Sequence, residues 1–156
     1  MASCEGDGYN QAIITRNSVS NSVSLTSPTD QNVITIQNTS TFASIPNKTQ
    51  LVMPFISSGT AGAKGVIFKL IRNATFGTTL TYTAINTNTS VVQYSTTTTS
   101  ATGGKPIFSF AVPVNGGSQL LLDSLNIIVV PGETLTLQAT SGNNVVDASL
   151  CWEELW

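Results

Sequence analysis

Short apolar runs with strand-like alternation run through the chain and are clearest near its C-terminal end. In residues 134–140, the apolar Leu135, Leu137 and Ala139 alternate with polar residues, which is the pattern of a half-buried strand. The preceding residues, 125–130, form a β-branched apolar run that stops at a Pro-Gly turn signal. Both segments are therefore predicted to be strands.

A turn and one more run complete this end of the chain. Because Gly142 and Asn143 tolerate the positive φ of a tight turn, we expect the final run to pair antiparallel with residues 134–140. Two tryptophans end the chain, so we expect its terminus to be buried in the core or against another copy. The final run places Val146, Ala148, Leu150, Trp152 and Trp156 on one face and Asp147, Ser149, Cys151 and Glu153 on the other.

Further strand candidates follow one another at the spacing of a β-sandwich, separated by Gly, Pro and Asn turn clusters, and no segment shows sustained helical periodicity. Pro54 and Pro113 fall inside apolar runs, which predicts that their strands lie at an edge or carry a bulge. The sequence thus predicts an all-β, antiparallel β-sandwich in residues 11–156, preceded by a Gly-rich leader in residues 1–10. The candidates cover residues 12–15, 22–26, 33–37, 50–57, 65–72, 79–85, 91–96, 107–114 and 119–122.

Charge is sparse in this chain. Only 9% of the residues are charged, the formal net charge is −2, and Thr, Ser, Asn and Gln fill the polar positions. Nucleic-acid binding is not expected, because no run of Lys or Arg supplies the attraction to phosphate. No apolar stretch is long enough for a membrane span, and the N-terminus does not resemble a secretory signal, so we expect synthesis in a cytoplasm. Because the low net charge gives little repulsion between molecules, we expect the chain to be part of an assembly.

The sequence offers few candidates for catalytic residues. The chain has no histidine, which removes Ser/His and Cys/His nucleophiles and His-based metal sites. Cys4 and Cys151 are too few for a zinc site or a disulfide scaffold, so free thiols are expected. The acids Asp123, Asp147, Glu153 and Glu154 show no pair spacing for glycoside hydrolysis, and solvated positions are expected for them. We therefore expect no enzyme activity, no metal and no cofactor.

Aromatic residues leave two interpretations open. Trp152 and Trp156, with Tyr82 and Tyr94, could form a platform on which a sugar stacks. Such residues are more often core or interface anchors. The anchor hypothesis covers Trp152, Trp156, Leu150, Ile127 and Val129.

The C-terminal thirty residues carry a family resemblance. The run from Pro131-Gly132-Glu133-Thr134-Leu135-Thr136-Leu137, through Val146 and Ala148-Ser149-Leu150, to Trp152-Glu153-Glu154 resembles head-decoration and head-fibre proteins of tailed bacteriophages. The resemblance implies a jelly-roll-like β-sandwich that forms a homotrimer on the outer surface of the capsid. It implies a structural role without catalytic residues, and its long-armed members differ from the short leader of this chain.

Three function classes follow from these observations. The first is a decoration protein that binds the assembled major capsid protein through the leader and nearby residues, for which Cys4, Tyr9, Arg16 and Lys48 are the candidate contacts. The alternative is the tip domain of a phage tail or head fibre that binds a receptor or host surface glycan. The third, an enzyme of the cell envelope, is disfavoured by the missing histidines and secretory signal.

Overall fold

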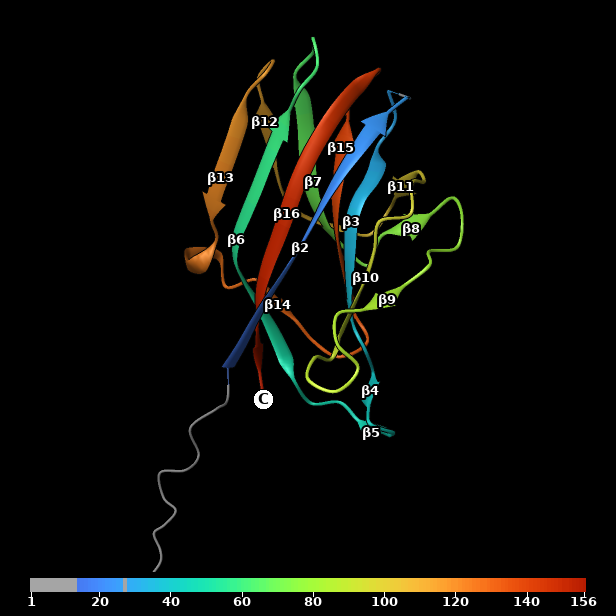
Figure 1. Ribbon diagram of the computed structural model, residues 1–156, viewed down its shortest axis with the longest axis vertical. Coiled ribbons are helices and arrows are strands. Elements are labelled where there is room, and N and C mark those ends of the chain that lie inside the picture. The colour runs from blue at the N-terminus through green and yellow to red at the C-terminus, as the bar shows by residue number, and fades with distance from the viewer. Residues whose placement is uncertain (1–13, 27) are drawn as a thin grey trace, which may run out of the picture.

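A computed structural model describes residues 14–26 and 28–156, and the fold is all-β. Two large antiparallel sheets lie face to face, with loops and short two-stranded ribbons at their margins (Figure 1). The leader predicted for residues 1–10, and with it Cys4 and Tyr9, lies outside the described residues. The prediction of an all-β, antiparallel architecture is confirmed.

The first sheet is five-stranded and contains both the first described strand and the last one. Its order is β13-β6-β16-β2, and the short strand β14 pairs with β6 beyond the end of β13. The strands span Gly117–Leu121 (β13), Gln50–Thr60 (β6), Asn144–Leu155 (β16), Ile14–Leu25 (β2) and Ile128–Val129 (β14).

The second sheet is six-stranded, with the order β12-β7-β15-β3-β10-β9. Its strands span Lys105–Val112 (β12), Val66–Arg72 (β7), Thr134–Thr140 (β15), Gln31–Asn38 (β3), Val92–Ser95 (β10) and Thr83–Ala84 (β9). Short ribbons pair Thr75–Phe76 (β8) with Ala101–Thr102 (β11) and Thr41–Phe42 (β4) with Ile45–Pro46 (β5). A 3-10 turn, η2, covers Asp123–Leu125.

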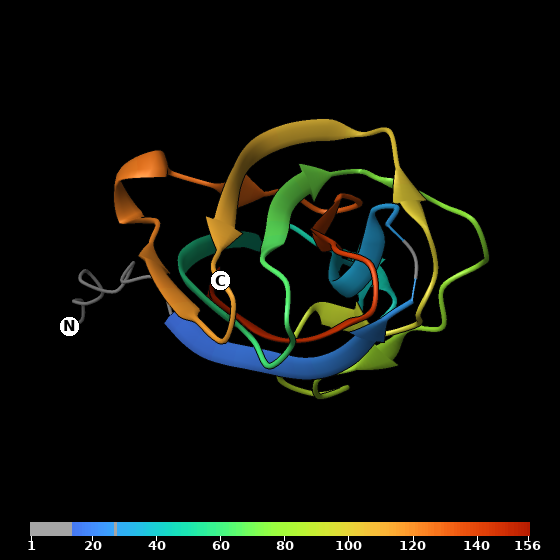
Figure 2. The ribbon, with the colours of Figure 1, turned by 90° about the horizontal axis from the view of Figure 1, so that it is seen from above.

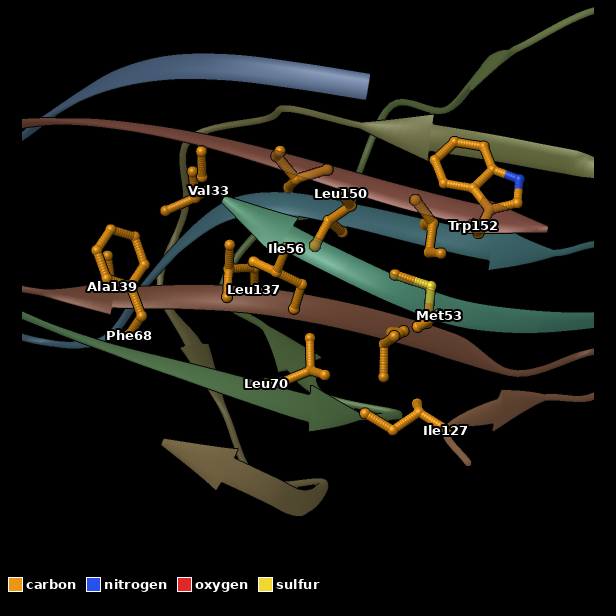
Figure 3. Packing of buried hydrophobic residues seen from close by; sticks show 14 of the residues in the cluster. Val33, Met53, Ile56, Phe68, Leu70, Ile127, Leu137, Ala139, Leu150 and Trp152 are labelled. Atoms are coloured by element: carbon orange, nitrogen blue, oxygen red, sulfur yellow. The ribbon is translucent and has the colours of Figure 1, made fainter. Parts of the chain in front are cut away.

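Alternating apolar side chains from both sheets make the core. Leu137 lies between Ile34 of β3 and Leu70 of β7, so these neighbours present one continuous apolar surface. That surface packs against Ile56 and Leu150 of the other sheet, as Figure 3 shows. The sheets curve around this core when viewed from above (Figure 2). Since burying apolar surface contributes roughly 25 cal/mol per Å², this two-sided core is the main source of stability.

The principal strands pair in a nested order along the chain. β2 pairs with β16, β3 with β15, β6 with β13, and β7 with β12. The first of these strands in the chain therefore pairs with the last, the second with the second last, and so on inward. All four pairings are antiparallel. The β16–β6 and β15–β7 pairings then join neighbouring pairs within each sheet.

The predicted hairpin between residues 134–140 and the final run is wrong. β15 belongs to the six-stranded sheet and β16 to the five-stranded sheet, so the turn between them crosses from one sheet to the other. Asn143 does adopt the positive φ that the prediction required, at 51°. The local turn was therefore recognised, but it does not fix the partner, because each strand gains two long-range neighbours by lying in a different sheet.

Several predicted strands also change their extent. The two strands predicted for residues 12–15 and 22–26 are, within the described residues, the two ends of one continuous strand, β2, whose middle is polar. Of the predicted strand 79–85, only Thr83–Ala84 is a strand, and residues 125–130 contribute only Ile128–Val129. Pro54 was predicted to mark an edge strand or a bulge, and the structure shows a bulge, because the β16–β6 register shifts between Cys151 and Glu153, opposite this proline.

Candidate interaction surface at the basal end

One end of the sandwich gathers both ends of the described chain. β2 begins there, β16 ends there, and the β4–β5 ribbon projects beside them (Figure 1). We call it the basal end and define it by Ile14–Thr15, residues 38–50 and residues 154–156. It draws together segments far apart in sequence, because the last residues of β16 pair with both the start of β2 and the start of β6.

Large apolar side chains lie exposed at the basal end. Ile14 is 55% exposed, Ile45 is 63% exposed and Trp156 is 39% exposed. The Trp156 ring lies 5.3 Å from that of Phe42, measured between centroids, with an interplanar angle of 59°. Leu155 pairs with Ile14, and Phe42 pairs with Ile45. The contacts of Phe42 with Trp156 and with Ile45 join these three residues into one surface, the basal patch, while Ile14 lies beside it on the outer face of the sheet. Contiguous exposed apolar surface of this kind marks interaction sites.

The tip of the β4–β5 ribbon has an unusual backbone. Ala43 and Ser44 both have positive φ, 51° and 67°, where a tight hairpin turn normally has Asn and Gly. Left-handed backbone costs about 1–2 kcal/mol for each residue that carries a Cβ. The two strained residues lie between Phe42 and Ile45 of the basal patch. Strained backbone is more common in functional loops than elsewhere.

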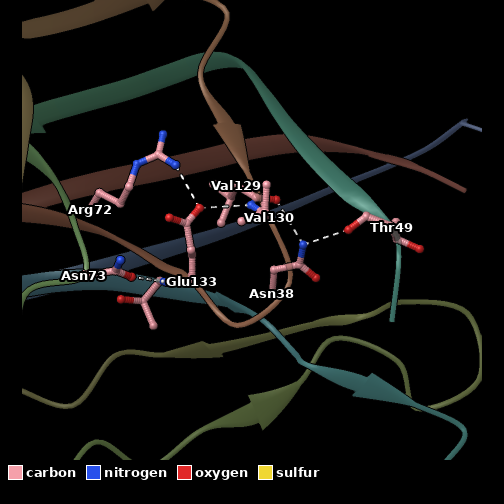
Figure 4. A network of polar contacts seen from close by, with 8 residues as sticks. Asn38, Thr49, Arg72, Asn73, Val129, Val130 and Glu133 are labelled. Atoms are coloured by element: carbon pink, nitrogen blue, oxygen red, sulfur yellow. Dashed lines mark hydrogen bonds and ion pairs between the residues drawn. The ribbon is translucent and has the colours of Figure 1, made fainter. Parts of the chain in front are cut away.

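Buried asparagine holds that ribbon in place. Asn38 Nδ2 donates to the backbone oxygens of Thr49, at 2.9 Å, and Val129, at 3.0 Å (Figure 4). Asn38 Oδ1 accepts from Nδ2 of Asn47 at 2.7 Å. Since Asn38 is fully buried, each of these groups would otherwise lose its hydrogen bond without access to water. The loop around Lys48 is therefore tied to β3 and β14.

A neighbouring ion pair fixes the turn between β14 and β15. Nη1 of Arg72 lies 2.8 Å from Oε1 of Glu133, which also accepts from the backbone N–H of Val130 at 3.1 Å. Asn73 Oδ1 accepts from the backbone N–H of Thr134 at 2.9 Å (Figure 4). Two polar networks therefore brace the loops behind the basal patch.

The sequence prediction that Glu154 is solvated is wrong. Its side chain is 0% exposed. Oε1 accepts from Ser90 Oγ at 2.5 Å and from Trp152 Nε1 at 3.3 Å, while Oε2 accepts from Thr15 Oγ1 at 3.3 Å. None of the described lysines or arginines forms an ion pair with it. The alternation along residues 146–156 could have revealed this position, because Glu154 shares the parity of Leu150 and Trp152.

Four of the five predicted anchors lie in the core, and the fifth does not. The core cluster contains Trp152, Leu150, Ile127 and Val129. Trp156 instead lies on the basal patch, and its Nε1 donates to Thr15 Oγ1 at 3.0 Å. Because the Trp152 indole is fully buried, it cannot take part in the surface sugar platform considered from the sequence.

The two described candidates for capsid contact both reach this part of the molecule. Lys48 is exposed in the loop behind the β4–β5 ribbon. Arg16 is on the outer face of β2, and its Nη2 lies 3.0 Å from Oε2 of Glu153. On the same face, burial raises the pKa of the Cys151 thiol above its ordinary value, while Arg16 acts to lower it and Glu153 to raise it. Cys151 is a free thiol.

The outer face of the five-stranded sheet is hollowed. An open groove of about 1080 Å³ is lined mainly by hydroxyl and amide side chains together with the carboxylate of Asp147. A smaller hollow of about 410 Å³ contains Asp123 and Glu153. The four acids considered for catalysis are thus divided between two hollows on this face and the interior. Ser20, Ser22, Ser57, Ser149 and Gln119 line the larger groove.

Comparison with known proteins does not add a relative. No protein-family model matches the chain, and no curated protein is significantly similar to it. Across residues 14–26 and 28–156, no cluster of three or more acidic or cysteine side chains could hold a metal ion. The same residues include no helix long and apolar enough to cross a bilayer.

Proposed function

We propose that this chain is a structural virion protein that binds the outer surface of an assembled phage capsid as a homo-oligomer and stabilises it. The observation that carries the proposal is the nested strand pairing, first with last and inward to β7 with β12. This pairing is what a long hairpin rolled into two sheets produces, and it supports a jelly-roll topology. Double-sheet jelly rolls are common in viral capsid and lectin domains.

The basal end supplies the surface for capsid binding in this proposal. It combines an exposed apolar patch with loops braced by the buried Asn38 and by the partly exposed Arg72–Glu133 pair, so little ordering cost accompanies binding. A homotrimer presents three basal patches at once, and multivalent contact raises the effective affinity without a strong single interface. Binding only to the assembled lattice stabilises that lattice by mass action.

A second candidate function is recognition of a host surface glycan by the tip of a tail or head fibre. The groove on the five-stranded sheet favours it, because its hydroxyl, amide and carboxylate groups suit hydrogen bonding to a polyol. It lacks the support of a tryptophan platform, since Trp152 is in the core. Virion decoration therefore remains the leading proposal.

Copy number on purified particles tests the proposal. We expect quantitative peptide mass spectrometry of the phage that encodes this chain to give a copy number of the same order as that of the major capsid protein. A handful of copies per particle would favour the fibre tip, and a glycan array with the purified protein would then be the next measurement. Complete absence from particles would overturn both functions.

A further inference from the structure

The two edges of the five-stranded sheet carry little of the usual protection against pairing, with Arg16 of β2 as the one charged residue of the two strands. In the described chain, β2 pairs only with β16 and β13 only with β6, so the far sides of both strands have no strand partner. Edge strands are usually blunted by lysine, proline, a bulge or short length. β2 has twelve residues without proline or lysine, and β13 has no charged residue or proline. Both edges are therefore competent to pair with another strand.

The edges of the six-stranded sheet are different. β12 begins with Lys105-Pro106, and its register with β7 shifts between Pro106 and Phe108. At the other edge, β9 has only two residues. Each of these features discourages edge-to-edge pairing. The contrast within one molecule points to the five-stranded sheet as the one that continues into a partner.

Hydrogen bonds identify which groups point outward from β2. The backbone N–H of Ala61 donates to the oxygen of Val145 at 3.0 Å, so Val145 and alternate residues of β16 turn their backbone groups toward β6. Val146 and its alternates then bond to β2 through Val23 and its alternates. The remaining residues of β2, including Ser18, Ser20 and Ser22, direct their N–H and C=O groups to the free edge.

The same reasoning applies to β13. Leu122 N–H donates to the oxygen of Pro54 at 2.8 Å, and Thr60 N–H donates to that of Gly116 at 2.9 Å. Even-numbered residues of this segment therefore direct their backbone N–H and C=O groups toward β6. Gly117, Gln119 and Leu121 direct their backbone groups to the free edge.

Strand direction decides how two copies can combine. β2, β16, β6 and β13 alternate in direction, so β2 and β13 run antiparallel to one another. A neighbouring copy in the same orientation therefore offers β13 antiparallel to β2. Pairing β2 with a second β2 would instead reverse one copy and turn the two basal ends in opposite directions.

We propose that β2 of one copy pairs antiparallel with β13 of the next copy, head to tail, and that this contact closes the homo-oligomer into a ring. Head-to-tail contacts generate rings when the rotation closes. The proposal rests on the proposed function in one respect, because a decorating ring needs all its basal ends on one side. The ring identifies the oligomer interface of that function.

Side chains along the two edges fit this contact. Leu121 is 77% exposed, the largest value among the exposed large apolar side chains of the described chain. It lies on the outer face of β13 and lines the smaller hollow beside Phe55 and Cys151, so a strand added at this edge would place its own outer-face side chains next to it. In the middle of β2 the outer-face residues are small, Ser18, Ser20 and Ser22, and leave room for Leu121 of a neighbouring copy. A net charge of −2 adds little repulsion between copies.

Two edge substitutions test the ring. Ser20→Pro and Gln119→Pro each remove one N–H that faces a free edge and leave the internal ladders intact. Ser20→Thr and Gln119→Thr are matched controls that keep the N–H. By light scattering after size exclusion, we expect the wild type and both controls at three times the chain mass and both proline variants as monomers. A monomeric wild type, or proline variants with unchanged mass, would overturn the proposal.

Mixing the two proline variants separates head-to-tail pairing from its alternative. Each variant keeps one good edge, so the mixture should form a heterodimer and nothing larger. If β2 paired with β2, Gln119→Pro alone would still self-associate, which contradicts the proposal. Amide exchange of the wild type provides a readout that needs no variant. We expect slow exchange at Ser18, Ser20 and Ser22, and fast exchange at all three would refute edge pairing.

The outcomes also separate this proposal from the proposed function. A wild type that is monomeric in solution but abundant on particles would refute the ring and leave decoration standing. A ring that dissociates in both proline variants, from a chain absent from particles, would establish the interface and refute decoration.

Discussion

The hydroxyl of Ser90 donates a hydrogen bond of 2.5 Å to Oε1 of the fully buried Glu154. This contact joins the loop before β10 to the last strand, and Thr15 and Trp152 complete the set of donors around the carboxylate. A carboxylate is costly to bury unless hydrogen bonds replace its water. The basal end thus depends on a polar centre as well as on apolar packing.

Replacing Glu154 with alanine should therefore be strongly destabilising. The substitution leaves two buried donors, on Ser90 and Trp152, and the partly buried hydroxyl of Thr15 without an acceptor, and we expect a loss of about 2–4 kcal/mol in the free energy of unfolding. Urea denaturation followed by far-UV circular dichroism measures it. Glu153→Ala is the matched control, because the neighbouring glutamate makes only a surface ion pair with Arg16 and its loss should matter little. Equal effects of the two substitutions would contradict the buried network.

Asn38 should be intolerant of an apolar replacement. Asn38→Leu keeps a similar volume but leaves the oxygens of Thr49 and Val129 unsatisfied, which should cost about 2–3 kcal/mol. Amide exchange should also quicken in residues 45–50, since the ribbon loses its tie to β3. An unchanged unfolding midpoint would show that this asparagine does not hold the basal loops.

Relieving the backbone strain at the tip of the β4–β5 ribbon should stabilise the protein. The double substitution Ala43→Asn and Ser44→Gly supplies residues that adopt positive φ readily, and we expect a gain of about 1 kcal/mol or more. Thermal unfolding of the variant and the wild type provides the comparison. If the strain serves binding, the variant should also bind particles differently despite its higher stability. A lower unfolding temperature would show that the turn needs Ala43 and Ser44 for another reason.

The basal patch should be required for binding to particles. Ile45→Asp places a carboxylate in the patch and should abolish co-sedimentation of added protein with particles that lack it. Ile67→Asp is the matched control, because Ile67 is 49% exposed at the start of β7, whereas β7 reaches the basal loops only at its other end, through Arg72. Loss of binding in the Ile67 variant alone, or in neither, would place the contact elsewhere.

Cys151 should react slowly with alkylating reagents at neutral pH. Burial raises the pKa of its thiol, so the thiolate forms only at a higher pH than in an unstructured cysteine peptide. In a Cys4→Ala background, the pH at which iodoacetamide alkylation reaches half its maximal rate should lie above that of the peptide. Arg16→Gln should move this pH further up, because Arg16 lowers the pKa, and Glu153→Gln should move it down. Shifts of the opposite sign would contradict the placement of these charges around the thiol.

The strands with the clearest alternation of apolar and polar residues are also strands that form long-range pairs in the structure. Residues 134–140 and 65–72 were recognisable because their apolar residues face a core whichever strands lie beside them. β2 was recognised only at its ends. Its middle, Asn17 to Asn21, is almost entirely polar, because Ser18 and Ser20 lie on the exposed outer face and Asn17 and Asn21 are only half-buried on the inner one. Local pattern therefore reveals burial better than it reveals sheet membership.

The candidate surface was only partly predictable. Arg16 and Lys48 were singled out, but nothing local to them indicates that they reach the same end of the molecule. Phe42 and Ile45 gave no signal, because their exposure follows from where the ribbon projects. Glu154 did give one, since its parity with Trp152 places it on the inward face of β16.

The sequence by itself determined the all-β class, the inward faces of the principal strands, an irregularity at Pro54 and the scarcity of charge, because each depends on the chemistry of neighbouring residues. Only the tertiary structure decided that β15 and β16 lie in different sheets, that Glu154 is buried with Ser90, and that the two ends of the described chain meet at the basal end. These features depend on pairing between residues more than sixty positions apart, and the many alternative pairings of short strands have similar local energies. The pairing that forms is the one that buries the most apolar surface between the two sheets.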